Sequence, residues 1–138
     1  MDRNLKIGIV GLGLIGGSIF KALCALKCSV YATSTSNTTI QKAKKYSPNV
    51  SKSLLHLKKC DIIFVCIPMN KTIEMLEKLN KILPGKAIVA DVCSLKGFLS
   101  KRKYNYTYIP THPMAGTEFS GFEYSFESLF QGAKWVLT

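Results

Sequence analysis

Metal-binding and disulfide-forming residues are scarce in this chain of 138 residues. It contains two histidines and five cysteines, and no two cysteines form a C-x-x-C pair. An odd number of cysteines without paired spacing is typical of reduced thiols in a cytosolic protein. Cys24 and Cys28 are four residues apart on an expected helix, where buried small side chains explain them better than a metal site does. We therefore expect no metal ion and a cytoplasmic location.

Long apolar runs and acidic residues are scarce as well. The most apolar stretch, Ile7–Phe20, is too short for a membrane span and contains five glycines. Eight acidic residues accompany 19 basic ones, which gives a net charge of +11. The lysines are scattered and no nucleic-acid-binding motif accompanies them, so we interpret them as solvated surface. We expect neither a membrane nor a nucleic acid as a partner.

The sequence does contain a regular alternation of strand and helix patterns. Helical periodicity is expected from Ile15 to Leu26 and over residues 39–46 and 72–83, with short helices near 54–57 and 98–99. This alternation predicts an α/β domain of the Rossmann type, a doubly wound, mainly parallel sheet flanked by helices, over residues 1–138. The expected strands cover residues 6–10, 29–33, 61–67, 87–91, 106–110 and 135–137.

A glycine-rich loop joins the first expected strand to the first expected helix. Gly11, Gly13 and Gly16 form the pattern G-x-G-x-x-G. The first glycine permits a tight turn, the second lets a backbone approach a pyrophosphate, and the third lets the helix lie close to the sheet. The helix N-terminus then offers free N–H groups to an anion. In this context the motif predicts dinucleotide binding.

The end of the second expected strand bears on the choice of cofactor. NAD-binding folds usually carry Asp or Glu about 20 residues after the glycine loop. Here residues 33–37 read TSTSN, without an acid. A carboxylate would repel a 2′-phosphate, whereas hydroxyl groups can donate to it, and Lys42 or Lys44 would be the nearby cation. NADP is slightly favoured over NAD, although this turn tolerates either.

Two further segments follow expected strands, at the edge of the sheet where ligands bind. Residues 91–97 read DVCSLKG, and residues 111–121 read THPMAGTEFSG. An imidazole such as that of His112 can accept a proton at neutral pH. A histidine beside a proline is more often structural, but the small and polar residues after it let a substrate come close. Asp91 is equally compatible with a strand-end cap and with a site role.

The motifs GLGLIGGS, DVCSLKG and HPMAGTEFSG, in this order and spacing, resemble the prephenate and arogenate dehydrogenases of tyrosine biosynthesis. The later YSFESLFQGAKWVLT is similar to the end of that family's cofactor domain, so the resemblance covers essentially the whole chain. Enzymes of that family oxidise the ring alcohol of their substrate by hydride transfer to NAD or NADP. Carbon dioxide leaves and the ring becomes aromatic. The resemblance does not decide between prephenate and arogenate.

The resemblance implies roles for individual residues. His112 would be the catalytic base, and Ser94 would position both the substrate hydroxyl and the imidazole. Ser94 and Pro68 would lie near the nicotinamide, and Ser34 and Thr35 near the adenosine ribose. The pyrophosphate would be bound by Gly11, Gly13, Leu14, Ile15 and Gly16, and the substrate would be bordered by Ser94, His112, Thr117 and Glu118.

The sequence departs from the family's pattern in length, because the family continues beyond this region into a C-terminal helical domain. That domain supplies dimer contacts and basic residues for the substrate carboxylates. We therefore expect a homodimer only with the missing domain, and little or no activity from the 138-residue chain alone. Two alternatives stay open. One is another NAD(P)-dependent enzyme of the β-hydroxyacid dehydrogenase type, and the other is a non-catalytic nicotinamide-binding module.

Overall fold

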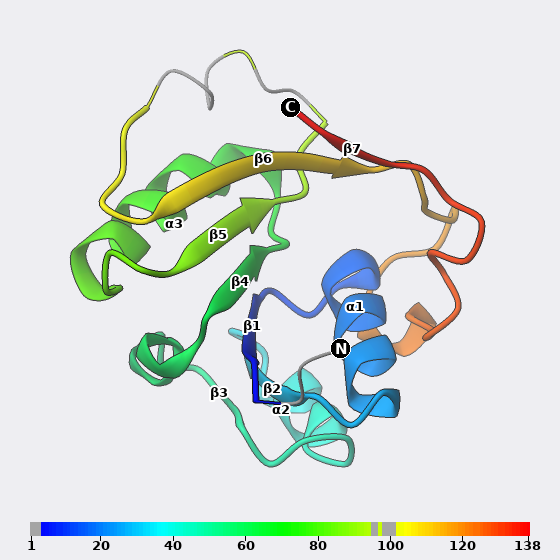
Figure 1. Cartoon of the computed structure of the whole chain (residues 1–138). Coiled ribbons are helices and arrows are strands. Elements are labelled where there is room, and N and C mark those ends of the chain that lie inside the picture. Colours follow the sequence, from blue (N-terminus) through cyan, green and yellow to red (C-terminus); the bar gives the residue numbers. More distant parts are fainter. Residues whose placement is uncertain (1–3, 95–96, 98–101) are drawn as a thin grey trace.

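A seven-stranded sheet organises the chain, of which the computed structural model describes residues 4–94, 97 and 102–138 (Figure 1). The strands are β1 (Lys6–Val10), β2 (Ser29–Thr33), β3 (Val50–Ser51), β4 (Ile62–Val65), β5 (Ile88–Asp91), β6 (Thr107–Pro113) and β7 (Trp135–Leu137). Their order is β3-β2-β1-β4-β5-β6-β7, and all neighbours are parallel except β6 and β7. The first six strands follow the order of doubly wound dinucleotide-binding folds. The predicted Rossmann-type fold is confirmed.

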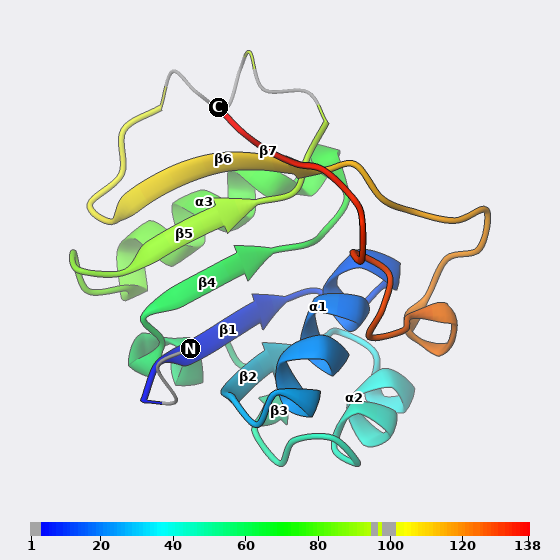
Figure 2. The same ribbon diagram turned by 45° about the vertical axis from the view of Figure 1, so that its right-hand side comes forward.

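Helices cover both faces of this sheet (Figure 2). The α-helices are α1 (Leu14–Ala25), α2 (Asn37–Ala43) and α3 (Met69–Ile82), and the 3-10 helices are η1 (Leu55–Lys59) and η2 (Phe122–Tyr124). Successive side chains of a strand point to opposite faces. Ile9 therefore joins the core beneath α1 and α2, and Val10 joins the core beneath α3. None of the helices in the described ranges is long and apolar enough to cross a membrane.

The far half of the sheet carries an apolar hollow on the face that points away from α3. Val89 of β5 is buried beneath α3, and the alternate residues Ile88 and Ala90 point to the other face. The hollow has a volume of about 440 Å³. It is lined by Ile62, Phe64, Ile88, Ala90, Ile109, Thr111, Trp135 and Leu137.

Some strand boundaries differ from the sequence-based expectation. The strand β3 was not predicted, because its two residues are too few to show a periodic pattern. The strand expected over residues 61–67 is shorter in the structure, where β4 covers Ile62–Val65. The strand β5 begins at Ile88, one residue later than expected. The strand β6 continues to Pro113, because β7 pairs with it antiparallel over residues 111–113. His112 therefore lies within β6 and not in the loop after it.

The helices also begin earlier than expected. The helix α2 starts at Asn37, because the Ser36 side chain caps it by accepting a hydrogen bond from the Thr39 amide at 3.2 Å, and it ends at Ala43. The helix α3 starts directly after Pro68. Its first three residues are exposed, so they lack the apolar stripe from which the helix was predicted. The short helix expected near 98–99 lies outside the described residues.

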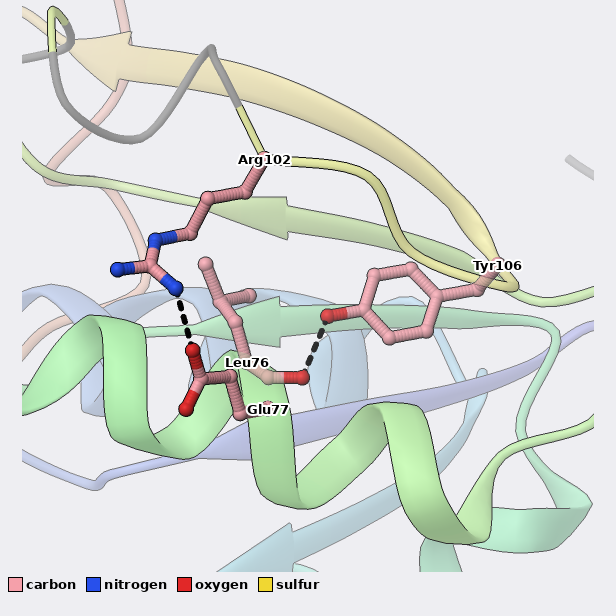
Figure 3. A network of polar contacts seen from close by, with 4 residues as sticks. All are labelled: Leu76, Glu77, Arg102 and Tyr106. Atoms are coloured by element: carbon pink, nitrogen blue, oxygen red, sulfur yellow. Dashed lines mark hydrogen bonds and ion pairs between the residues drawn. The ribbon is translucent and has the colours of Figure 1, made fainter.

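Polar contacts tie the segment before β6 to α3 (Figure 3). The Tyr106 hydroxyl is buried and donates a hydrogen bond of 2.7 Å to the Leu76 carbonyl. Burial raises the pKa of Tyr106, so the hydroxyl keeps its proton. Arg102 forms an ion pair with Glu77 on the surface of the same helix. The buried hydrogen bond should matter more than the exposed ion pair.

Replacing Tyr106 by Phe should lower the free energy of unfolding by about 1–2 kcal/mol, because it removes a buried hydrogen bond. Replacing Arg102 by Ala should cost at most about 0.5 kcal/mol, because exposed ion pairs contribute little. Urea denaturation of both variants measures the difference. Equal losses would show that the ranking of the two contacts is wrong.

Candidate functional site

The glycine loop brings the backbones of β1, α1 and the end of β4 unusually close together. Gly11 has φ +93°, and a Cβ atom there would lie 2.5 Å from the Cys66 carbonyl oxygen. A Cβ atom on Gly16 would overlap the Gly11 carbonyl oxygen. At Gly13, by contrast, a Cβ atom would have no described residue other than its two chain neighbours within 4 Å. Two glycines are therefore needed for packing, and the third leaves open space.

A cavity of about 470 Å³ lies next to this loop, at the carboxyl ends of β1, β2 and β4. These strands flank the point where the winding of the sheet reverses, which is where doubly wound folds bind their ligands. The cavity brings together five of the predicted cofactor-binding residues, which are Gly11, Gly13, Ser34, Thr35 and Pro68. Leu14, Ile15 and Gly16 form the first turn of α1 and are not among the lining residues.

Two lysines that the sequence analysis missed also line this cavity. Lys52 follows β3, and Lys78 lies on α3 with an ion pair of 3.0 Å to Glu74. Neither Lys42 nor Lys44, which were suggested as phosphate partners, is among the lining residues. Lys52 was missed because β3 was missed, and β3 pairs with β2 beside the end of that strand. In the sequence, only the apolar Val50 and the polar Ser51 before Lys52 indicate this strand.

His112 is half-buried near the carboxyl end of β6, beyond the last pairing between β5 and β6 at Asp91 and Pro110. Its Nδ1 atom lies 3.4 Å from the Val92 carbonyl oxygen. A carbonyl can only accept, so this contact assigns the ring proton to Nδ1 and leaves the lone pair on Nε2. Within the described part of the chain the ring has no other hydrogen-bond partner. The Nε2 atom can therefore accept a proton.

The other predicted substrate residues lie on exposed loops. Ser94 is exposed, two residues beyond Val92. Thr117 and Glu118 are exposed as well, and the Thr117 hydroxyl accepts a hydrogen bond of 3.2 Å from the Phe119 amide. Neither Thr117 nor Glu118 forms a hydrogen bond with His112 among the residues that the structure describes. The structure thus brings five of the predicted cofactor residues to one cavity, whereas no hydrogen bond joins the predicted substrate residues to one another within the described part of the chain.

Three cysteines are held as neutral thiols, and one of them, Cys66, lines the cavity. Cys66 follows β4 directly, and desolvation of its thiol raises the pKa. Burial also raises the pKa of Cys24 to about 11 and that of Cys60 to about 12. Thiolates are the form in which cysteines act as nucleophiles and metal ligands. Among the described residues, no group of three or more His, Cys, Asp or Glu side chains is placed to hold a metal ion.

The glycine geometry leads to opposite expectations for two substitutions. Gly13→Ala should change the free energy of unfolding by less than about 1 kcal/mol but weaken dinucleotide binding about tenfold, because the methyl group enters the cavity. Gly16→Ala should cost about 1–3 kcal/mol of stability, because the methyl group has no space. Denaturant unfolding and fluorescence titration with NADPH and NADH measure the two effects. Gly116→Ala is the control, because its Cβ would also meet open space, away from the cavity. Wild-type binding by Gly13→Ala would contradict the assignment of the cavity.

Comparisons with known proteins show the family to which the chain belongs. The family "Prephenate dehydrogenase, nucleotide-binding domain" matches residues 20–138. Cyclohexadienyl dehydrogenase from Zymomonas mobilis is 29% identical over 141 residues, which cover 96% of this chain and 48% of that protein. The chain thus spans about half the length of this relative.

Two solved structures are similar over 97% of this chain and 50% of their own. Arogenate dehydrogenase from Synechocystis has a TM-score of 0.89 and 35% sequence identity. Prephenate dehydrogenase from A. aeolicus, in complex with hydroxyphenyl propionate and NAD+, has a TM-score of 0.80 and 30% identity. The family match covers most of the chain and the structural matches include the glycine loop before it. The chain belongs to the prephenate dehydrogenase family, in which it corresponds to the nucleotide-binding domain.

Proposed function

We propose that this chain is the NAD(P)-binding domain, with the catalytic base, of an enzyme that oxidises and decarboxylates prephenate or arogenate in tyrosine biosynthesis. The observation that carries the proposal is the placement of two features at one edge of the sheet. The cavity beside the glycine loop and the imidazole of His112 both lie at the carboxyl ends of parallel strands. Similarity to an arogenate dehydrogenase and a prephenate dehydrogenase of known structure supports it.

The residues around the cavity fit a dinucleotide. The space at Gly13 lets a pyrophosphate approach the backbone, and no side chain caps the N-terminus of α1. The amides of Leu14, Ile15 and Gly16 would hold the pyrophosphate, Ser34 and Thr35 the adenosine ribose, and Pro68 and Ser94 would border the nicotinamide. When bound, the nicotinamide supplies the hydride acceptor of the reaction.

His112 provides the acid–base chemistry in this proposal. Its Nε2 atom accepts the proton of the substrate's ring hydroxyl as the hydride leaves the ring carbon that bears this hydroxyl. The Val92 carbonyl holds the Nδ1 proton and stabilises the imidazolium that forms. Ser94 positions the hydroxyl, and Thr117 and Glu118 border the substrate. Loss of carbon dioxide makes the ring aromatic, so the protein mainly has to align the donor and the acceptor.

The cofactor is proposed to be NADP in preference to NAD. No carboxylate lies on the lining of the cavity, and the hydroxyls of Ser34 and Thr35 stand there together with Lys52. Lys52 is exposed and has no hydrogen-bond or ion-pair partner among the described residues. A 2′-phosphate would therefore meet hydrogen-bond donors and a positive charge.

The rest of the enzyme is proposed to be a further domain, because the similar proteins are about twice as long as this chain. The family resemblance implies that this domain is helical. That domain would pack on the apolar hollow of β4–β7, complete the substrate pocket and form the homodimer. By itself, the 138-residue chain would bind the cofactor with little turnover. The five free cysteines fit a reducing compartment, and we propose a cytoplasmic location.

Replacing His112 by Asn tests the role of the base. In the chain joined to the helical domain of a longer relative, kcat should fall by about 10²–10⁴-fold, because Asn cannot take the proton. Cofactor affinity should stay near that of the wild type, because His112 does not line the cavity. Steady-state kinetics and cofactor titration separate the two effects. Wild-type turnover by His112→Asn would remove His112 from the mechanism, and robust turnover by the chain alone would contradict the need for a second domain.

Replacing Lys52 by Ala tests the choice of cofactor. The Kd for NADPH should rise about tenfold or more, because a charge-assisted contact with the 2′-phosphate is lost. The Kd for NADH, which lacks this phosphate, should hardly change. Lys42→Ala is the matched control, since it removes the same charge at a position outside the cavity. A wild-type protein that binds NADH more tightly than NADPH would defeat the proposed preference.

A further inference from the structure

Asp91 is the last residue of β5, and its carboxylate is fully buried. One carboxylate oxygen accepts hydrogen bonds from the Tyr108 hydroxyl at 2.9 Å and from the Thr111 amide at 3.4 Å. The other accepts a hydrogen bond of 2.9 Å from the Cys93 amide. The Thr111 hydroxyl also donates to the Asp91 carbonyl. A single side chain therefore joins the turn after β5 to the part of β6 that carries His112.

The contacts of Asp91 fix the positions of Val92 and His112, whose carbonyl oxygen and Nδ1 atom form the hydrogen bond that orients the imidazole. Val92, whose carbonyl faces the Nδ1 atom of His112, lies between Asp91 and Cys93, the residues that close the turn. Thr111, which directly precedes His112, is held on the other side by the same carboxylate and by the Asp91 carbonyl. A shift of the carboxylate would therefore move the acceptor and the donor relative to each other.

Tyr108 supports this arrangement as a stable donor. Burial is the main cause that raises the pKa of the Tyr108 hydroxyl, and the nearby charge of Asp91 raises it further. The hydroxyl thus keeps its proton and donates it to the carboxylate at all ordinary pH values. A buried carboxylate that accepts several hydrogen bonds holds its surroundings in one geometry, because losing any one bond leaves a buried polar group unpaired.

We propose that Asp91 is a positioning residue for His112, whose carboxylate fixes the turn so that the Val92 carbonyl binds the Nδ1 proton and Nε2 faces the substrate as the base. The inference rests on the proposed function only in its last part, which states that Nε2 faces the substrate as the base. The tautomer of the ring is a property of the protein without substrate. At 3.4 Å the contact between Nδ1 and the carbonyl is long, as orienting contacts often are before a substrate binds.

The test is the tautomer of His112, measured by long-range ¹⁵N–¹H correlation spectra of the 138-residue chain at a pH where the ring is neutral. His56 is the only other histidine, so a His56→Gln background leaves one imidazole to observe. The wild-type ring should be protonated at Nδ1. In Asp91→Asn the amide nitrogen cannot accept a hydrogen bond, so the Nδ1 resonance should move toward that of an unprotonated nitrogen. A ring protonated mainly at Nε2 in the wild type would overturn the proposal.

Ser47→Ala is the matched control, because it removes a buried hydrogen bond of 2.8 Å to the Val30 carbonyl at the opposite end of the sheet. It should lower stability without changing the tautomer. If Asp91→Asn is folded and keeps the wild-type tautomer, the proposal is wrong. If Asp91→Asn does not fold, Tyr108→Phe decides, since it removes one donor and keeps the carboxylate. A partial shift in that variant supports the proposal, and an unchanged ring rejects it.

This experiment separates the proposal from the proposed enzyme activity. A shifted tautomer in a protein whose longer form has no dehydrogenase activity would uphold the positioning role and reject the function. An unchanged tautomer together with loss of turnover in His112→Asn would reject the positioning role alone.

Discussion

The close approach of backbone to backbone at the glycine loop is the constraint on which the rest of the site depends. Gly16 lies against the Gly11 carbonyl, and Gly11 lies against the Cys66 carbonyl at the end of β4, with no space for a side chain at either place. This contact brings the first turn of α1 down to the sheet between β1 and β4. The cavity is the space that remains in front of it. A larger residue at either position would move the helix and close or distort that space.

The parallel sheet turns this local contact into a site by placing the ends of several strands side by side. The loop after β1, the turn after β2 and the start of α3 meet around the cavity, while the turn after β5 meets β6 at His112. The antiparallel strand β7 adds a second effect, because it continues the sheet along residues 111–113. This pairing gives the imidazole a rigid strand as its support instead of a mobile loop.

Charge and apolar surface are distributed over this domain in a way that suits its proposed partners. The chain has a net charge of +11, and Lys52 and Lys78 stand at the cavity, where an anionic dinucleotide would lie. The hollow of β4–β7, in contrast, is lined by apolar residues and one threonine. Uncovered apolar surface of this kind favours association with another protein surface.

The sequence alone was sufficient for the fold class, the alternation of strands and helices and the glycine loop, because these follow from local periodicity and from the backbone freedom of glycine. It also identified His112 as a candidate base. It did not predict β3 or the cavity lysine Lys52, because a two-residue strand leaves no pattern and its partner β2 is distant in the chain. The burial of Asp91 and its bonds to Tyr108 and Thr111 were equally invisible. Pairing between distant strands decides such contacts, so only the tertiary structure could reveal them.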